Sequence, residues 1–250
     1  MPILVLLSFA LQIACAVHVV RSGRPLYWIW LLLIGSYLAV IVYFLIAILP
    51  DLRNDPRGRA VTRNVLERID PERRRREIRQ RLDVADTVHN RKALAEECLR
   101  LGDYANAADL YRSILTGFYA TDPMFMLGLA KSEAGLGDHA AARVTLDALI
   151  GANPQFRSPE GHLLYARCLE ELGEHDAAIE EYEGLARSYP GEEARFRYGV
   201  LLRRRGRSGD ARAVFEDMLK RARLAPRYYR RKEQEWIAAA KRELSNSELA

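Results

Sequence analysis

Charge is almost absent from the first fifty residues of this sequence, where Arg21 and Arg24 are the only formally charged side chains. Nearly every other charged residue follows Pro50. The core of a soluble domain gives no reason for this separation, so the pattern disfavours a single soluble domain over the whole chain. It is typical of a membrane anchor followed by a water-soluble part.

Cysteine is also scarce. Cys15, Cys98 and Cys168 are far apart and form no Cys-x-x-Cys pair, which argues against a disulfide framework or a zinc site. Cys98 and Cys168 fall at helix positions that face a core. We therefore expect buried free thiols in a reducing compartment.

The motifs of common enzymes are missing. The sequence has no Gly-rich phosphate loop, no cluster of metal ligands and no Gly-x-Ser-x-Gly motif. Acidic pairs such as Glu170 and Glu171 are expected on solvated helix faces. The five histidines are scattered and are expected to be structural: His18, His89, His139, His162 and His175. We predict a protein that is not an enzyme, with no catalytic residues, no metal site and no cofactor.

The first fifty residues do contain two uncharged runs, residues 2–20 and 26–49. Each has about the 20 residues that a helix needs to cross a bilayer. Gly23 and Pro25 lie in the short connection between them and suit a tight reversal. Trp28 and Trp30 follow, where an interfacial aromatic belt is expected. The sequence predicts a transmembrane helical hairpin over residues 1–50, with helices at about 2–20 and 26–49.

The distribution of basic residues predicts the orientation of this hairpin. The connection holds two arginines, whereas residues 51–81 hold eleven. The positive-inside rule then gives a multi-pass protein of the cell (inner) membrane whose soluble part faces the cytoplasm. In an alternative, residues 1–16 are a signal peptide cleaved after Ala-Cys-Ala, although a positive n-region is missing. Both interpretations leave the soluble part on the same side.

A His-x-x-Arg stretch and two aromatic residues in this region form a pattern: His18, Arg21, Trp28 and Tyr43. The pattern resembles the two-helix N-terminal segment of phospholipase D-type cardiolipin synthases, over about fifty residues. Ser36 and Ala39 replace the proline and glycine of that family's second helix. The catalytic His-x-Lys-x4-Asp motif is absent from the chain. The resemblance therefore implies membrane anchoring and no lipid chemistry.

A charged connector, residues 51–87, follows the hairpin. Its segment 72–82 (ERRRREIRQRL) predicts a helix that is capped by Asp70, with Pro71 in the first turn. Only a thin apolar stripe is present, so we expect a largely solvated helix. Its arginines would either contact anionic headgroups, each contributing about 1 kcal/mol, or belong to a soluble spacer.

Glycine and alanine then recur with a nearly constant period. Gly102, Gly137, Gly173 and Gly206 are 35, 36 and 33 residues apart. Small residues precede each glycine by seven positions (Ala95, Ala130, Ala166, Gly199), and alanines follow it by five (Ala107, Ala142, Ala178, Ala211). Four positions later stand large residues: Tyr111, Leu146, Tyr182 and Phe215. This period indicates stacked helix pairs, in which a left-handed glycine ends each first helix.

The pattern resembles tetratricopeptide repeats, which implies an all-α solenoid with four repeats over residues 88–224. Asp122 and Ser158, each before a proline, are expected to cap first helices. In the first unit the closing proline, Pro123, comes four residues late, which predicts a longer second helix or loop. Residues 225–250 would form a C-terminal capping helix and tail, with a packing stripe over 228–244: Tyr229, Trp236, Ala240 and Leu244.

The same resemblance implies a partner-binding groove on the first helix of each pair. The asparagine-plus-lysine clamp that some relatives use for chaperone C-termini is not reproduced. A mixture of basic and apolar residues occupies the groove positions, which suits an acidic or amphipathic peptide. These positions are Lys92, Glu96, Leu127, Lys131, Leu163, Arg167, Phe196, Arg197, Arg203 and Arg204.

We therefore predict a membrane-anchored scaffold or adaptor whose cytoplasmic groove binds a protein or peptide. The alternative is an anionic-phospholipid-associated factor in envelope or membrane biogenesis. Bases outnumber acids over residues 203–242, so an anionic membrane surface is the second partner. The acidic middle of a neighbouring subunit is another possibility for this basic end, and nucleic acid is the least favoured partner. The sequence leaves the oligomeric state open.

Overall fold

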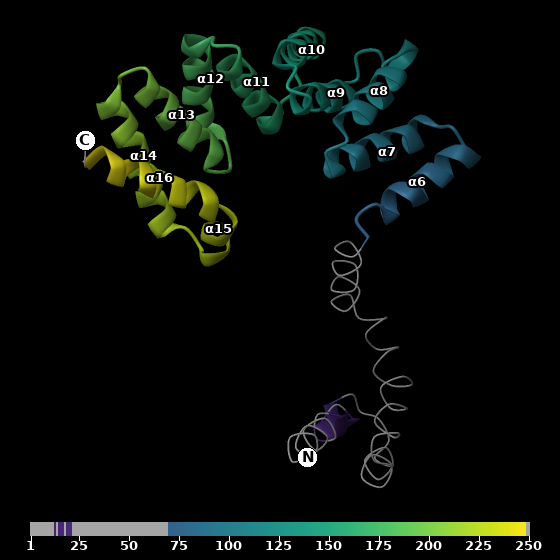
Figure 1. The fold of residues 1–250 in the computed structure, drawn as a ribbon, viewed down its shortest axis with the longest axis horizontal. Helices are drawn as coiled ribbons and strands as arrows, with labels where there is room; N and C mark the ends of the chain where they lie inside the picture. The colour runs from purple at the N-terminus through teal and green to yellow at the C-terminus, as the bar shows by residue number, and fades with distance from the viewer. Residues whose placement is uncertain (1–12, 14, 18, 22–69, 249–250) are drawn as a thin grey trace. The chain divides into compact units, whose positions relative to one another are not determined.

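The structure is a computed structural model that describes residues 13, 15–17, 19–21 and 70–248 (Figure 1). It divides into two units, Met1–Arg73 and Arg74–Ala250, and nearly all of the described residues belong to the second. The expected second membrane helix and most of the first lie outside the described residues. Of the four residues that carry the resemblance to cardiolipin synthases, only Arg21 is described. Within the described part, no helix combines the length and apolar character that a membrane span requires.

All regular structure in residues 70–248 is helical (Figure 1). The helices are α6 (Arg73–Val84), α7 (Val88–Leu101), α8 (Tyr104–Ile114), the 3-10 turn η2 (Gly117–Tyr119), α9 (Pro123–Gly135), α10 (His139–Ala152), α11 (Pro159–Glu171), α12 (His175–Ser188), α13 (Glu193–Arg204), α14 (Ser208–Leu224), α15 (Arg227–Lys232) and α16 (Gln234–Glu248). From α7 to α14 each helix packs on the next in the chain. The predicted all-helical solenoid is confirmed.

Left-handed glycines end the first helix of each pair, as the period predicted. Gly102, Gly137, Gly173 and Gly206 have φ angles of 77°, 82°, 79° and 78°. In the first pair the Gly102 N–H donates to Leu99 and the Asp103 N–H donates to Cys98. These bonds satisfy carbonyl groups that the end of α7 would leave unpaired. The expected caps are also present, because Asp122 accepts from Met124 and Phe125, and Ser158 accepts from Gly161.

Small residues allow the helices to approach closely. The four predicted alanines of the second helices are at most 1% exposed, and the large residues four positions later are at most 3% exposed. A Cβ atom on Gly128 would lie 2.3 Å from Cζ of Tyr111, and one on Gly199 would lie 2.5 Å from Cε1 of Phe215. Both contacts are too close for a side chain, so these glycines are required by packing.

Helix α6 is largely solvated, as its sequence predicted, but its thin apolar stripe docks on the first repeat. Ile78 is buried in a cluster with Leu94, Cys98 and Ala107 of the first repeat, and Arg75 forms an ion pair of 3.2 Å with Asp103. One buried isoleucine and this ion pair hold α6 against α7 and α8. The expectation of a largely solvated connector helix is confirmed for α6, because nine of its twelve residues are exposed and only Ile78 is buried.

The C-terminal segment folds as two helices rather than as one. The chain breaks at Glu233, whose carboxylate accepts a 2.9 Å hydrogen bond from the backbone N–H of Glu192. Trp236, Ala240 and Leu244 pack on α14 as the predicted stripe. Tyr229 lies on the separate helix α15, where its hydroxyl donates to Glu192. The stripe therefore begins after Glu233 and excludes Tyr229.

Candidate partner-binding surface

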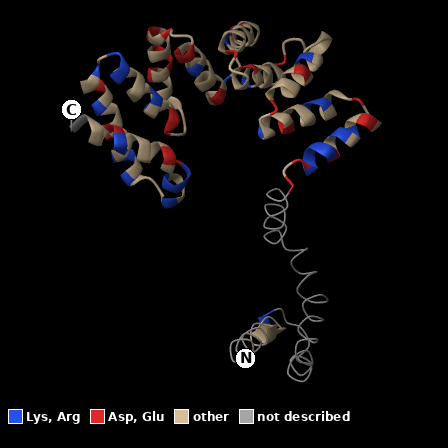
Figure 2. Cartoon of the chain, in the orientation of Figure 1, with Lys and Arg blue, Asp and Glu red and all other residues tan. Residues whose placement is uncertain are grey.

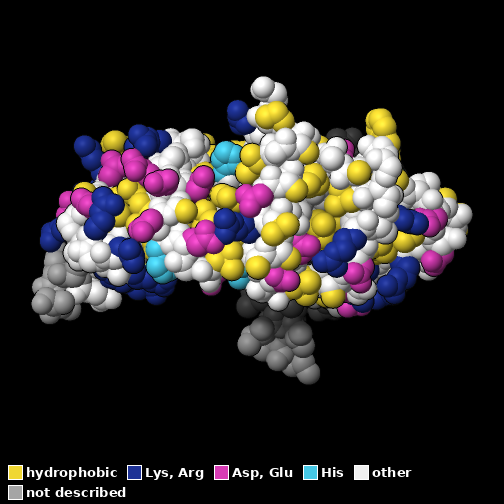
Figure 3. All heavy atoms as spheres, turned by 90° about the horizontal axis from the view of Figure 1, so that it is seen from above, with side chains coloured by type: hydrophobic (Ala, Val, Ile, Leu, Met, Phe, Trp, Pro, Cys, Tyr) yellow, Lys and Arg dark blue, Asp and Glu magenta, His cyan; other side chains and the backbone are white. Residues whose placement is uncertain are grey.

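Ion pairs connect the first helices of successive repeats. Lys131 of α9 lies 2.6 Å from Glu160 of α11. Arg167 of α11 lies 3.9 Å from Glu193 of α13. Arg203 of α13 pairs with Glu243 of α16. Figure 3 shows basic, acidic and apolar side chains interspersed over one face of the array.

The densest part of this network is an arginine cluster, which we define as Arg167, Arg197 and Arg204 with Glu170 and Glu193. Nε of Arg197 donates to Glu193 at 2.8 Å. Nη1 of Arg204 donates to Glu170 at 3.3 Å, and Nη1 of Arg197 lies 3.9 Å from the same carboxylate. Three cations therefore face two carboxylates, which leaves the cluster with one net positive charge.

Glu170 is held in place from the interior of its repeat. Its side chain is 9% exposed and accepts a 2.9 Å hydrogen bond from the hydroxyl of Tyr182, which is fully buried. Burial raises the pKa of Tyr182, and the charge of Glu170 raises it further. The hydroxyl thus stays protonated and available as a donor at neutral pH. The prediction of a solvated face was wrong for Glu170.

Trp236 of α16 borders the cluster. The guanidinium carbon of Arg197 lies 5.7 Å from the centre of its ring, within cation–π range. Phe196 packs against the same ring at a centroid distance of 5.5 Å. Burial alone would lower the pKa of Arg197, but the hydrogen bond to Glu193 and the nearby carboxylates raise it above its ordinary value. Arg197 is therefore a permanent cation beside an aromatic surface.

The predicted groove positions divide into four groups. Lys131, Arg167, Arg197, Arg203 and Arg204 lie in the ion-pair network described above. Lys92 and Glu96 pair with each other on α7 at 3.5 Å. Leu127 and Leu163 are only 4% and 5% exposed and pack between helices, so the structure contradicts their assignment to an open groove surface. Phe196 is half-buried against Phe215 and Trp236.

Three partners of the arginine cluster were missed from the sequence: Glu170, Glu193 and Trp236. The spacing of Glu193 and Arg197 is a visible signal, because residues four apart on a helix can pair. Glu170 and Trp236 gave no such signal. Their partners come from helices that are distant in sequence, so only the stacking of the repeats brings these residues to the cluster.

A separate cavity of about 380 Å³ lies between α10, α11 and α12. Leu146, Leu149, Phe156 and Tyr165 form most of its apolar wall, and Leu127 also reaches it. Arg157 lies at the rim, where its guanidinium donates to the carbonyl of Pro154 at 2.8 Å. The volume falls within the range of small-ligand pockets, and the lining suits an apolar group.

The described residues contain no group of three or more potential metal ligands. Cys98 and Cys168 are buried free thiols, as predicted. Burial raises the pKa of both thiols, that of Cys168 to about 11, so neither is a reactive thiolate at neutral pH. His139 and His175 are the first residues of α10 and α12, where each begins the second helix of a repeat.

Residues 127–193 and 185–228 match the sequence profile of the tetratricopeptide repeat. Residues 127–228 therefore resemble tetratricopeptide repeats in sequence. The helical array has the fold of TTC0263, a thermophilic tetratricopeptide repeat protein of Thermus thermophilus, with a TM-score of 0.53 and 18% identity over 74% of this chain and 94% of that one. No curated protein sequence is significantly similar to this chain.

Two further solved structures resemble the tetratricopeptide array more distantly. MamA gives a TM-score of 0.46 at 16% identity, covering 70% of this chain and 90% of that one. YrrB, a tetratricopeptide repeat protein with an unusual peptide-binding site, gives 0.47 at 15% identity, covering 68% and 87%.

Proposed function

We propose that this protein is a membrane-anchored adaptor whose tetratricopeptide repeats bind an acidic segment of a protein partner in the cytoplasm. The observation that carries this proposal is the arginine cluster, in which three guanidinium groups share two carboxylates. A repeat array with this chemistry is suited to binding.

The exposure of the arginines favours an acidic ligand. The side chains of Arg167 and Arg204 are 46% and 63% exposed. Partly exposed ion pairs contribute little to stability, roughly 0–1 kcal/mol. A carboxylate of a partner can therefore take over either arginine at small cost to the repeats. Arginine also presents paired donors that match a carboxylate in geometry.

Trp236 adds an apolar contact to this surface. Its ring is half-buried beside Arg197, so it offers an aromatic face next to the cationic one. A segment with acidic residues and a neighbouring apolar side chain would use both features. Such segments are common among disordered regions that order on binding.

The membrane part of the proposal rests on the uncharged runs 2–20 and 26–49 and on the eleven basic residues that follow them. It assigns the protein to the cell (inner) membrane with the repeats in the cytoplasm. A reporter enzyme fused after Ala250 tests this assignment. We expect activity from a reporter that works only in the cytoplasm, and activity only outside it would reject the assignment.

Photo-crosslinking in intact cells tests the binding surface. A photoreactive residue that replaces Arg204 should capture a partner segment rich in Asp and Glu. Mass spectrometry identifies the captured segment. The same residue at Val144, which is 68% exposed on α10, is the control for nonspecific capture. Capture that is equal at both positions, or of segments without acidic residues, would refute the acidic-ligand proposal.

The alternative, an anionic-phospholipid-associated factor, is favoured by a different observation. Residues 218–232, at the end of the array, have seven basic side chains and no acidic one, and none of these residues belongs to the arginine cluster.

A further inference from the structure

Residues 218–232 form a basic corner at the end of the array. This stretch covers the end of α14, the turn at Ala225 and Pro226, and α15. It has seven basic residues and no acidic residue: Lys220, Arg221, Arg223, Arg227, Arg230, Arg231 and Lys232. Figure 2 shows Lys and Arg concentrated on α15.

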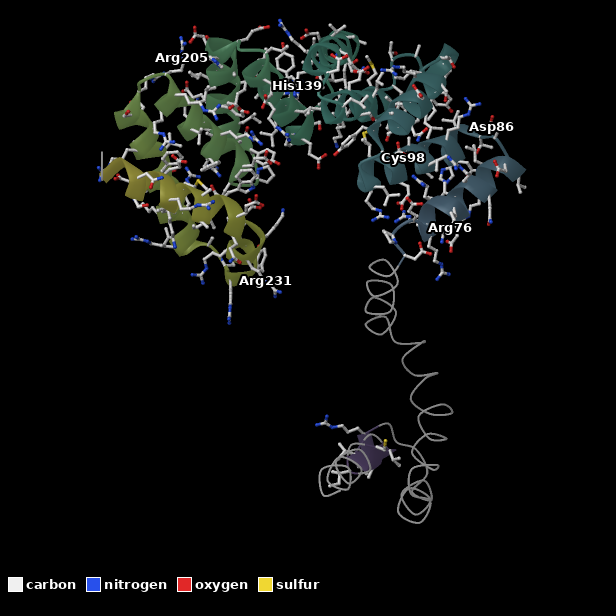
Figure 4. The ribbon with its side chains drawn as sticks, viewed as in Figure 1. Arg76, Asp86, Cys98, His139, Arg205 and Arg231 are labelled. Carbon is white, nitrogen blue, oxygen red and sulfur yellow. The ribbon has the colours of Figure 1, made fainter. Side chains whose placement is uncertain are left out.

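Most cations of the basic corner lack a carboxylate partner. Arg221 pairs with Asp217 at 2.6 Å, and Lys232 lies 3.8 Å from Glu233. The other five have no ion pair with any part of the chain that the structure describes. All five are exposed, and Figure 4 shows Arg231 projecting away from the helices. The arginine cluster differs, because each of its arginines already has a carboxylate within 4.0 Å.

A small cavity of about 180 Å³ lies between the basic corner and α16. Arg223, Arg230 and Lys241 line it together with Leu219, Ala222 and Ile237. Within the described residues, none of the three cations has a hydrogen bond or ion pair. Three unpaired cations around one hollow with an apolar floor suit a phosphate group attached to an apolar chain.

Two apolar side chains project beside these cations. Leu224 and Tyr228 flank the turn at Ala225 and Pro226 and are 83% and 76% exposed. The neighbouring Tyr229 points inward, because its hydroxyl bonds to Glu192. Exposed apolar side chains among cations are typical of surfaces that lie in the headgroup region of an anionic bilayer.

We propose that the basic corner docks on an anionic phospholipid bilayer, with a lipid phosphate in the hollow between Arg223, Arg230 and Lys241. Leu224 and Tyr228 enter the headgroup region on either side of the turn. This surface differs from the arginine cluster, so the inference does not rest on the adaptor proposal.

A second copy of this chain is the competing occupant, through its acidic middle. Four carboxylates at or near α11 and α12 are engaged within their own chain. Glu170 pairs with Arg204, Glu174 with Arg143, Asp176 with Arg205 and Glu183 with Arg187. A second copy would also leave Leu224 and Tyr228 without an apolar partner, since those carboxylates are polar. The bilayer satisfies both the cations and the apolar side chains.

The test measures binding of the full chain to vesicles of phosphatidylcholine alone and of phosphatidylcholine mixed with phosphatidylglycerol. The measured quantity is the partition coefficient for the mixed vesicles divided by that for phosphatidylcholine alone. Apolar insertion contributes equally to both coefficients, so it cancels in this ratio. We expect Arg223→Gln with Arg230→Gln to lower this ratio about 30-fold, because each cation near an anionic surface contributes about fivefold. High salt should lower the wild-type ratio in the same direction.

Arg187→Gln with Arg212→Gln is the matched control, since both arginines are exposed on α12 and α14 and the net charge changes equally. Its ratio should stay close to wild type. An unchanged ratio in the Arg223 and Arg230 variant, or an equal fall in the control, would overturn the proposal. Self-association that the variant abolishes, with the vesicle ratio unchanged, would assign the basic corner to a second copy instead.

Discussion

The hydroxyl of Tyr229 donates a 2.8 Å hydrogen bond to Glu192, which lies thirty-seven residues earlier in the chain. Arg195 donates to the other oxygen of the same carboxylate at 3.2 Å, and Glu233 accepts from the Glu192 backbone at 2.9 Å. Glu192 is 1% exposed. Helix α15 is thereby held to the start of α13 by buried polar contacts.

We predict that Tyr229→Phe lowers the free energy of unfolding by about 1–3 kcal/mol, because a buried carboxylate oxygen loses its donor. Thermal unfolding followed by far-ultraviolet circular dichroism measures the change. Tyr228→Phe is the control, since Tyr228 is exposed and its hydroxyl has no partner among the described residues. Equal melting temperatures for the two variants would show that the contact does not hold α15.

We predict that the buried hydroxyl of Tyr111 makes the protein less stable at alkaline pH. Burial, with a smaller effect of Glu96, raises the pKa of Tyr111 to about 12 from 10. Between these values the unfolded chain loses the proton first, so stability falls as pH rises from about 10 towards 12. The loss amounts to roughly 2–3 kcal/mol.

Tyr111→Phe should remove that part of the alkaline loss. The measurement is urea unfolding of wild type and variant between neutral pH and pH of about 12, and the quantity is the difference between their pH profiles. Other buried tyrosines and thiols titrate equally in both proteins and cancel. Parallel profiles would mean that the Tyr111 hydroxyl is not buried on folding.

Gly128 tests the close approach of successive repeats. Gly128→Ala places a Cβ atom 2.3 Å from the Tyr111 ring, and overpacking of this kind costs about 1–3 kcal/mol. Gly151→Ala on α10 is the matched control, because nothing lies within 4 Å of its Cβ position. It should be neutral or stabilising by up to about 1 kcal/mol. If Gly128→Ala were as stable as Gly151→Ala, the repeats would not be packed as described.

Ile78 tests the docking of α6. Ile78→Ala removes most of the buried side chain that joins α6 to the first repeat. We expect faster amide hydrogen exchange in α6 and little change in α11 to α14, since contacts in a repeat array are local. Val84→Ala, at a position 89% exposed, should exchange like wild type. Unchanged exchange in α6 for Ile78→Ala would show that Ile78 does not hold the helix.

Short-range patterns in the sequence predicted much of the fold. Gly102 and Ala107 lie in one turn and the helix after it, and such local features determine where helix pairs begin and end. Glu170 could not be assigned in this way, because its burial depends on Arg204 and Tyr182 from other helices. The break at Glu233 was missed for the same reason, since its partner lies at residue 192.

The candidate site was predicted in part. Arg167, Arg197 and Arg204 were identified by their repeat positions, whereas Leu127 and Leu163 share those positions and are buried. Repeat position alone does not separate the two groups, because burial depends on the residues that the next repeat presents.

Reversing the charges of the arginine cluster and of its ligand tests most directly the claim that this cluster binds an acidic segment. The acidic segment recovered by crosslinking is synthesised, and its affinity for the full chain is measured by calorimetry. We predict that Arg167→Glu with Arg204→Glu weakens binding by tenfold or more, roughly the effect of 1.4 kcal/mol, and that lysines in place of the segment's acidic residues restore it. Affinity that is unchanged in the variant, or not restored by the lysines, would contradict recognition by this surface.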